Sequence, residues 1–598
     1  MTKKHRSFRN PLSMAGALVA AMFALPLQAQ TEPPDGPPAR GLIVRLKQPV
    51  ANESLHPRGA NPRTREGTQG SVRWQRVLGE AGLSGASGRV EPRMRPVGRD
   101  QQLIEFERPL SRREAASLRD KLMARPDVDW VEPNLRERRL QASPSDPLFT
   151  QQWWLQPVSG SNANALEARL RGVAGFQTAW LRASHAPAVV AVLDTGITTH
   201  EDLSTSRILP SRDFVSEVDY ANDGDGWDTD PSDPGDYVSS NDLTNPIFSG
   251  CAVENSSWHG TIIAGMVAAH TGNGIGGAGM HWGASILPVR VAGKCGAALQ
   301  DIVDGMRWAA GLQVVDDGGK TLPVNGNPAR IINISFGGSA ACGPAYQSAV
   351  DELRAIGVVV VAAAGNEWSG PSRPASCPGV VGVVGLNRDG FKTNYSNFGG
   401  QIGISGIAAV AGDDSQGAWG SVLADSGLVT LTNRGSTVPT SDGYARLYGT
   451  SFAAPQVAGT IAHMLSLNPT LSYEQIVQGL RASARPHVVS PKIAQCSDSN
   501  PGRCICTTAT CGAGILDADQ ALLYATMPDS YVAPRRLAEV IDNAQVDAAL
   551  ALAPQDRPSN VVQVSSSSSG GGAFGGFWLL ALATAALTLP ALRTPRRR

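Results

Sequence analysis

The chain has 598 residues, 42% of them hydrophobic, so it is too long for one domain and long enough to build a large core. Its 52 basic and 52 acidic residues balance, which gives no reason to expect a nucleic-acid partner. The charge is unevenly placed, because residues 1–140 are rich in arginine and residues 194–240 are rich in aspartate.

Residues 1–29 have the pattern of an export signal. A positive start that includes Lys3 and Arg6 precedes an apolar run over 14–25, and small Ala29 stands just before the expected cut. A buried core helix is the alternative for this run. Export would place the eight cysteines in an oxidising compartment, where their even number fits disulfides.

Residues 30–142 predict a small α+β unit after a Pro-rich start. Alternating residues 42–46 and 102–106 are typical of strands, residues 112–124 of an amphipathic helix and residues 128–131 of a short strand. A basic run over 136–139, followed by two prolines, indicates an exposed and cleavable connection.

Residues 143–527 predict an α/β domain. The apolar runs over 188–193, 331–334 and 358–362 are mostly β-branched and do not alternate, as in strands that are buried on both faces of a parallel sheet. Helical patterns over 302–310 and 345–356 lie between them, so we expect a mostly parallel central sheet.

The last part of the chain divides into two predicted segments. Residues 528–569 are expected to be a flexible linker that ends in a run of serines. Residues 570–598 combine a Gly-rich start, an apolar stretch over 577–592 and a terminal arginine cluster. This pattern predicts a marginal membrane span with a cytoplasmic positive end, with a buried terminal helix as the alternative.

Hydrolysis of a peptide by a serine requires a hydroxyl, an imidazole and a carboxylate in contact, together with a donor for the oxyanion. Asp194 ends the apolar run 188–193, where the sites of α/β proteins usually lie, although an ordinary turn aspartate is the alternative. His259 begins an apolar helix that contains Gly260 and other small residues, which would allow close backbone packing.

Ser451 follows Gly449 and Thr450 and opens a second helix of small residues. The free N–H groups at a helix start favour a negative oxygen beside this serine. A plain N-cap serine is the alternative.

The three segments resemble the subtilisin-like serine proteases, or subtilases, over about residues 145–525. The resemblance rests on Asp-Thr-Gly at Asp194, His-Gly-Thr-x-x-Ala-Gly at His259 and Gly-Thr-Ser-x-Ala-x-Pro at Ser451, in the subtilisin order. It implies a subtilisin-like three-layer fold and a catalytic triad of these residues. It also implies that Asn366, in Ala-Ala-Ala-Gly-Asn, donates to the oxyanion.

The same resemblance implies a substrate-binding edge at Ser335, Phe336 and Gly337, together with Gly365, although a plain strand end is the alternative. Extended substrate would add there as a strand. Phe452 replaces a common methionine and Gln456 a common histidine, neither of them in the triad.

An acidic loop over 219–236 predicts a structural Ca²⁺ site. Clustered carboxylates repel one another unless a cation lies among them, and hard oxygen ligands suit Ca²⁺. Asp223, Asp225 and Asp228 are the expected ligands. A solvated acidic loop is the alternative.

The cysteines are expected to form disulfides, and two of the pairs follow from the family resemblance. These are Cys251 with Cys295 and Cys342 with Cys377. The other four would pair among themselves, with Cys506–Cys511 as one option: Cys496, Cys504, Cys506 and Cys511. A zinc site at this group is the alternative, although it lacks a nearby histidine and the usual Cys-x-x-Cys pairs.

By resemblance, the whole chain is a secreted serine endopeptidase made as an autoinhibited precursor. Residues 30–142 resemble a subtilase propeptide that assists folding and inhibits the site, and residues 570–598 resemble a bacterial Gly-Gly sorting tail. The expected partners are protein or peptide substrates, the chain's own propeptide and, before processing, the membrane. The expected location is secreted or at the cell surface after export through the inner membrane. A catalytically silent subtilase-fold protein that binds peptides or surfaces is the alternative.

Overall fold

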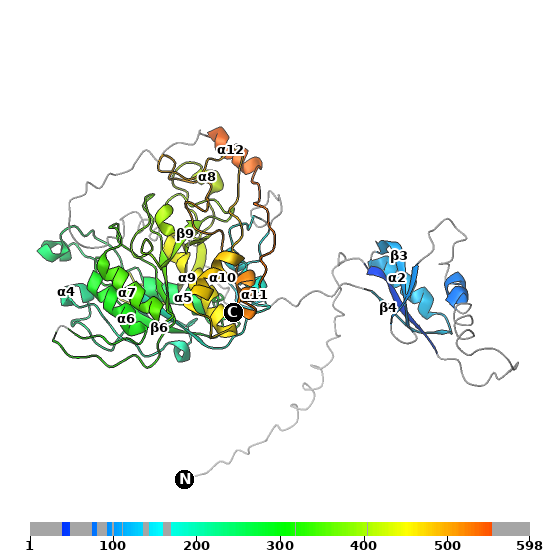
Figure 1. Cartoon of the computed structure of the whole chain (residues 1–598), viewed down its shortest axis with the longest axis horizontal. Helices are drawn as coiled ribbons and strands as arrows, with labels where there is room; N and C mark the ends of the chain where they lie inside the picture. Colours follow the sequence, from blue (N-terminus) through cyan, green and yellow to red (C-terminus); the bar gives the residue numbers. More distant parts are fainter. Residues whose placement is uncertain are drawn as a thin grey trace, which may run out of the picture. The chain divides into compact units, whose positions relative to one another are not determined.

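The computed structural model describes residues 39–47, 74–80, 93–97, 101–110, 112–134, 143–159, 169–316, 318–403 and 405–552. The chain divides into two compact units, residues 1–139 and 140–598, which are described separately here (Figure 1). The predicted export signal, the cleavable connection over 136–139 and the tail 570–598 lie outside the described residues.

The N-terminal unit is an antiparallel sheet with a helix packed on it. The strand order is β2-β3-β1-β4, and the alternating residues Leu42 and Val44 of β1 share an apolar cluster with Ala115 and Leu122 of α2. The elements are β1 (Ala39–Leu46), β2 (Arg93–Pro96), β3 (Gln101–Leu110), α2 (Arg112–Met123) and β4 (Val128–Pro133), with a further helix over 74–80.

The C-terminal unit is built on a six-stranded sheet in which every neighbouring pair is parallel. The strand order is β10-β9-β8-β7-β5-β6, so the order reverses between β5 and β7. The strands are β5 (Ala188–Asp194), β6 (Ala284–Arg290), β7 (Ile331–Ile334), β8 (Val359–Ala363), β9 (Val381–Leu386) and β10 (Ile407–Val410). In open sheets of this kind, sites form at the carboxyl ends of strands beside such a reversal.

Helices cover both faces of this sheet and complete a three-layer α/β fold, as predicted. Val190 and Val192 of β5 belong to the cluster that includes helices α5 (His259–Ala268) and α9 (Ala454–Leu467). Ala191 belongs to a second cluster, with α6 (Leu299–Ala309) and α7 (Pro344–Ala355). Because successive strand residues face opposite sides, the two clusters lie on opposite faces of the sheet (Figure 1).

The remaining elements of this unit pack around the layers. They include a two-stranded antiparallel ribbon, β11 and β12, that follows β10 in the chain. Their bounds are α3 (Phe176–Ala179), α4 (Val218–Ala221), α8 (Gly420–Leu423), β11 (Leu428–Asn433), β12 (Asp442–Leu447), α10 (Tyr473–Ser483), α11 (Ala518–Thr526) and α12 (Ala544–Leu552).

The beginning of the predicted linker 528–569 packs against the core instead. Ile541 is buried and its N–H donates to Val489 O at 2.8 Å, and Val546 and Ala549 are buried on one side of α12. Because these residues are buried, residues 528–552 belong to the C-terminal unit. The polar, Ala-rich composition of the segment concealed its few apolar residues.

The structure offers no membrane span within the residues it describes, because none of their helices combines the necessary length and apolarity. The predicted span over 577–592 lies outside them.

Candidate active site

Asp194 and His259 form a buried pair at the carboxyl edge of the sheet. Asp194 is the last residue of β5 and His259 the first of α5. The Nδ1 atom of the His259 ring lies 2.9 Å from each carboxylate oxygen of Asp194. The side chain of Asp194 is 1% exposed and that of His259 is 9% exposed. The carboxylate accepts only from a protonated Nδ1, so this bond makes Nε2 the basic nitrogen of the ring.

A close backbone contact sets the spacing of this pair. The N–H of Gly260 donates to Thr195 Oγ1 at 3.1 Å, and a Cβ at position 260 would lie 2.1 Å from Gly196 O. Glycine is therefore the residue that lets α5 begin against the turn after β5. Gly260 thus permits the close backbone packing expected of it.

Ser451 lies in a single 3-10 turn, Thr450–Phe452, that leads into α9. Its hydroxyl donates to Ser335 O at 2.6 Å, and its own carbonyl accepts from Ser335 Oγ at 2.9 Å. The ring of Phe452 lies 5.9 Å from the His259 ring between centroids. The serine, the imidazole and the end of β7 thus meet in one place.

Asn366 lies beside Ser451 with its amide held in one orientation. Its Oδ1 accepts from the N–H and from the hydroxyl of Thr450, each at 3.0 Å. Because a backbone N–H can only donate, these bonds identify the oxygen and direct Nδ2 away from Thr450. Gly365, with φ of +106°, precedes it, and a Cβ there would lie 2.3 Å from the amide of Asn397.

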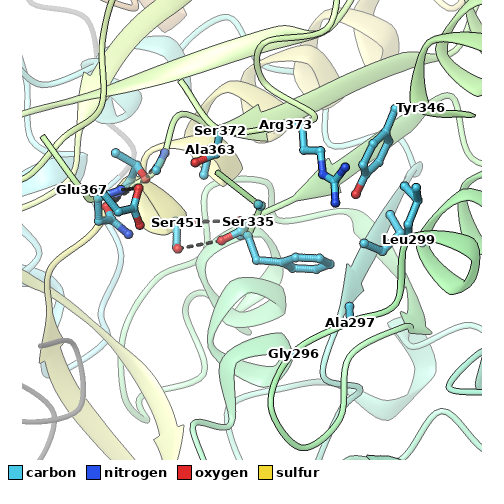
Figure 2. Close-up of a pocket in the computed structure, with 17 residues that line it drawn as sticks. Gly296, Ala297, Leu299, Ser335, Tyr346, Ala363, Glu367, Ser372, Arg373 and Ser451 are labelled. Carbon is cyan, nitrogen blue, oxygen red and sulfur yellow. Dashed lines mark hydrogen bonds between the residues drawn. The ribbon is translucent and has the colours of Figure 1, made fainter. Parts of the chain in front are cut away.

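A groove extends from these residues along the predicted substrate edge. It is lined by Ser451, Asn366 and Gly365 and by the segment Ser335, Phe336 and Gly337. Figure 2 shows Ser451 bonded to Ser335 near one end of the groove, with Arg373, Tyr346 and Leu299 toward the other. The residues expected to bind substrate are therefore contiguous with the expected nucleophile.

Residues 186–510 match a model of the Subtilase family, Peptidase_S8. The chain belongs to this family. The structure of this subtilase has the expected three-layer fold, and the order Asp194, His259 and Ser451 lies within the matched region.

Curated relatives and a solved structure agree with this assignment. The "Extracellular protease" of Xanthomonas campestris pv. campestris is 36% identical over 71% of this chain and 64% of its own length. The "Extracellular basic protease" of Dichelobacter nodosus is 35% identical over 59% of this chain and 53% of its own length, so the matches span less than two thirds of either relative. A solved structure of a protease from Pseudoalteromonas arctica PAMC 21717 is 40% identical, covers 64% of this chain and all of its own, and has a TM-score of 0.52.

Two further carboxylates of the acidic loop lie near the Asp194–His259 pair of this subtilase, and the sequence analysis did not single them out. The carboxylate of Asp236 accepts from the backbone N–H of Ser257 at 2.6 Å and from Ser257 Oγ at 2.7 Å. The same Oγ accepts from the backbone N–H of His259 at 3.3 Å. Asp233 accepts from Thr195 Oγ1 at 2.6 Å. Both belong to the acidic loop 219–236, whose composition predicted a Ca²⁺ site, with a solvated loop as the alternative.

These charges affect the titration of the imidazole. Burial alone would lower the pKa of His259, but the charge and hydrogen bond of Asp194, together with the charges of Asp236 and Asp233, outweigh burial and raise that pKa. Burial in turn raises the pKa of Asp233 to about 7, with Asp236 contributing.

The predicted calcium ligands are not brought together. The carboxylate of Asp223 accepts from the guanidinium of Arg290, a side chain that is 1% exposed, and Asp228 Oδ1 accepts from a backbone N–H two residues further on. Among the described residues, the carboxylates of Asp223, Asp225 and Asp228 form no group of three ligand atoms within 4.8 Å of one another. Arg290 pairs with Asp223 and with the buried Asp213, so Asp223 is already engaged and the three carboxylates do not fit a single Ca²⁺ site.

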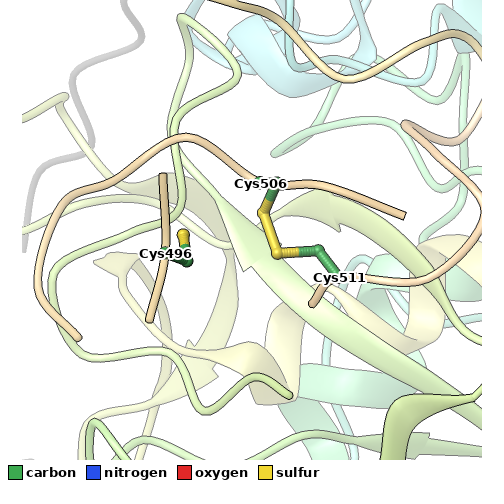
Figure 3. A group of neighbouring side chains, drawn as sticks. All are labelled: Cys496, Cys506 and Cys511. Atoms are coloured by element: carbon green, nitrogen blue, oxygen red, sulfur yellow. A yellow bond between two sulfur atoms is a disulfide. The ribbon is translucent and has the colours of Figure 1, made fainter. Parts of the chain in front are cut away.

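All eight cysteines form disulfides, including both pairs implied by the family resemblance and the optional pair Cys506–Cys511. The zinc alternative is not supported, because the neighbouring sulfurs of Cys496, Cys506 and Cys511 are all oxidised (Figure 3). The four bonds are Cys251–Cys295, Cys342–Cys377, Cys496–Cys504 and Cys506–Cys511.

Proposed function

We propose that this subtilase is a secreted serine endopeptidase that works through an acyl-enzyme on Ser451. The observation that carries the proposal is the 2.9 Å contact of His259 Nδ1 with Asp194, together with a groove that is lined by Ser451 and Asn366. The extracellular proteases among its relatives support secretion and peptide-bond hydrolysis.

In the first half of the reaction, Ser451 Oγ turns from Ser335 O toward His259 and attacks the scissile carbonyl carbon. His259 Nε2 takes the hydroxyl proton, and Asp194 holds the ring in the required tautomer and stabilises the imidazolium. The carbonyl oxygen becomes an oxyanion, to which Asn366 Nδ2 and the Ser451 N–H donate.

Collapse of this intermediate breaks the carbon–nitrogen bond and leaves the acyl group on Ser451. The leaving amine receives the proton from His259. Water then attacks the ester with His259 as base, and the same donors stabilise the second intermediate before Ser451 regains its proton. The peptide lies extended along Ser335, Phe336 and Gly337 and beside Gly365, with main-chain bonds of the kind formed in strand addition.

The precursor organisation is part of the proposal. The N-terminal unit is a folded α+β body of its own, as an intramolecular inhibitor would be. We infer that a cut near residues 135–145 activates the enzyme and that residues 570–598 hold the precursor briefly at the membrane. N-terminal sequencing of the secreted protein tests the cut near residues 135–145. Protein that has lost the N-terminal unit should hydrolyse substrate without inhibition.

Active-site labelling tests the catalytic assignment. The secreted protein should react with phenylmethylsulfonyl fluoride at Ser451 alone and should hydrolyse casein until it is labelled. Ser451→Ala should abolish both reactions, whereas Ser499→Ala, at an exposed serine, should change neither. Folded protein without labelling or hydrolysis would instead indicate the catalytically silent, peptide-binding alternative.

A further inference from the structure

The groove ends at an arginine that the proposed catalytic steps do not use. Arg373 lines the same groove as Ser451, and in Figure 2 its guanidinium lies beside Tyr346 on the side toward Leu299. Apolar Phe336 also lines this part of the groove. Arg373 itself is half-buried, so its charge is accessible from the groove.

The backbone holds Arg373 firmly in this position. Its N–H donates to Gly338 O and its carbonyl accepts from the Gly338 N–H, each at 3.0 Å. The disulfide Cys342–Cys377 ties the following turn to the segment before α7. The guanidinium carbon lies 5.8 Å from the ring centroid of Tyr346, so the side chain is supported as well as the backbone.

Among the residues that the structure describes, the guanidinium pairs with no carboxylate. Within the described parts of the chain, no Asp or Glu oxygen lies within 4.0 Å of it. The one carboxylate that lines the groove, Glu367, is engaged elsewhere, because its Oε2 accepts from the Asn366 N–H at 2.8 Å and from Asn397 Nδ2 at 2.6 Å.

We propose that Arg373 selects substrates that carry an aspartate or glutamate at a position removed from the scissile bond, where the bound peptide reaches the far end of the groove. This inference rests on the proposed function and names the substrate class of the same groove. Tyr346 supports one region of the planar guanidinium, and the remaining N–H groups can bond a carboxylate in the paired geometry that arginine favours. The apolar walls at Phe336 and Leu299 reduce screening by water and strengthen the attraction.

The test uses quenched peptides that are identical except for Asp, Asn or Lys at one position, scanned across five residues on each side of the cut. The secreted protein should prefer Asp to Asn by about 5- to 20-fold in kcat/KM at one position removed from the bond. Arg373→Leu should bring this ratio close to one, and Arg373→Glu should favour Lys at the same position. The matched control is Arg354→Leu, because Arg354 also lies over a tyrosine ring, that of Tyr473 at 4.9 Å, but outside the groove.

The ratio is taken within each variant, so a reduced yield of folded protein does not affect it. Binding of the same peptides with a reduced scissile amide, measured by fluorescence anisotropy, separates the two proposals. Hydrolysis without an acidic preference, or with one that Arg373→Leu retains, overturns the role of Arg373 and leaves the peptidase assignment standing. Arg373-dependent tighter binding of Asp peptides without hydrolysis supports this inference and overturns the peptidase assignment, and the absence of both effects overturns both.

Discussion

Replacing Gly260 by alanine should damage catalysis although alanine is the better helix former. Within a helix, alanine is ordinarily favoured over glycine by about 1 kcal/mol. Here the new Cβ would lie 2.1 Å from Gly196 O, whereas contacts below 3.0 Å essentially never occur. The start of α5 must therefore move by roughly 1 Å away from the turn that follows Asp194, and misplacement of this size can cost about 10²-fold in rate.

The assay is kcat on a chromogenic peptide, normalised by active-site titration with phenylmethylsulfonyl fluoride, so that only folded enzyme is counted. Gly459→Ala is the matched control, because Gly459 also lies inside a helix and its Cβ would meet no backbone atom, the three nearest atoms all belonging to the Met280 side chain at 3.2 Å or more. This control should keep wild-type activity. If Gly260→Ala keeps it too, the backbone contact does not set the geometry of the pair and the reasoning is refuted.

Three other changes test the chemistry and the titration of the site. Asn366→Leu removes the oriented amide donor and should lower kcat by roughly 10²–10³-fold with little change in KM; an unchanged kcat would exclude an oxyanion role. Asp236→Asn removes a negative charge that raises the pKa of His259, so the acid limb of the kcat/KM–pH profile should move to lower pH; a shift to higher pH, or none, contradicts this. Burial lowers the pKa of His463 to about 4, so the unfolded state alone gains its proton as the pH falls from roughly 6.5 to 4. Stability should fall across that window, and urea unfolding of the Ser451→Ala protein should show a shallower decline in His463→Gln than in the parent.

Much of the site could be predicted because its residues stand at the ends of recognisable elements. The β-branched run before Asp194 indicates a buried parallel strand, and the sheet then places Asp194 at the same edge as Ser335, which follows β7. Sequence patterns also indicate that a helix begins at His259, whereas the helix expected to open at Ser451 begins at Ala454, after a 3-10 turn that carries the serine. What they do not contain is the angle at which those helices pack, which depends on contacts such as that of Gly260 with Gly196.

The acidic loop shows why residue type alone was insufficient. Composition correctly indicates that carboxylates so close together need a positive partner, but it does not say which one. The partner of Asp223 is Arg290, the last residue of β6, which lies beside Asp194 in the sheet register. A contact between positions so far apart in the chain follows only from the completed sheet. The same holds for Ile541, whose burial depends on a bond to Val489.

The geometry of this site is therefore a property of the core rather than of the bonds between the site's own side chains. A single hydrogen bond contributes on the order of 1 kcal/mol net, too little to hold two helices and a strand in register. Helix α5, which begins at His259, and helix α9, which follows the turn that carries Ser451, instead share one apolar cluster on one face of the sheet, and Asp194 ends the strand β5 of that sheet. Because that cluster is close-packed, the backbone elements that carry the imidazole and the serine can shift relative to each other only if the core repacks. The sensitive positions around this site should accordingly be the glycines at the element starts as much as the groups that react.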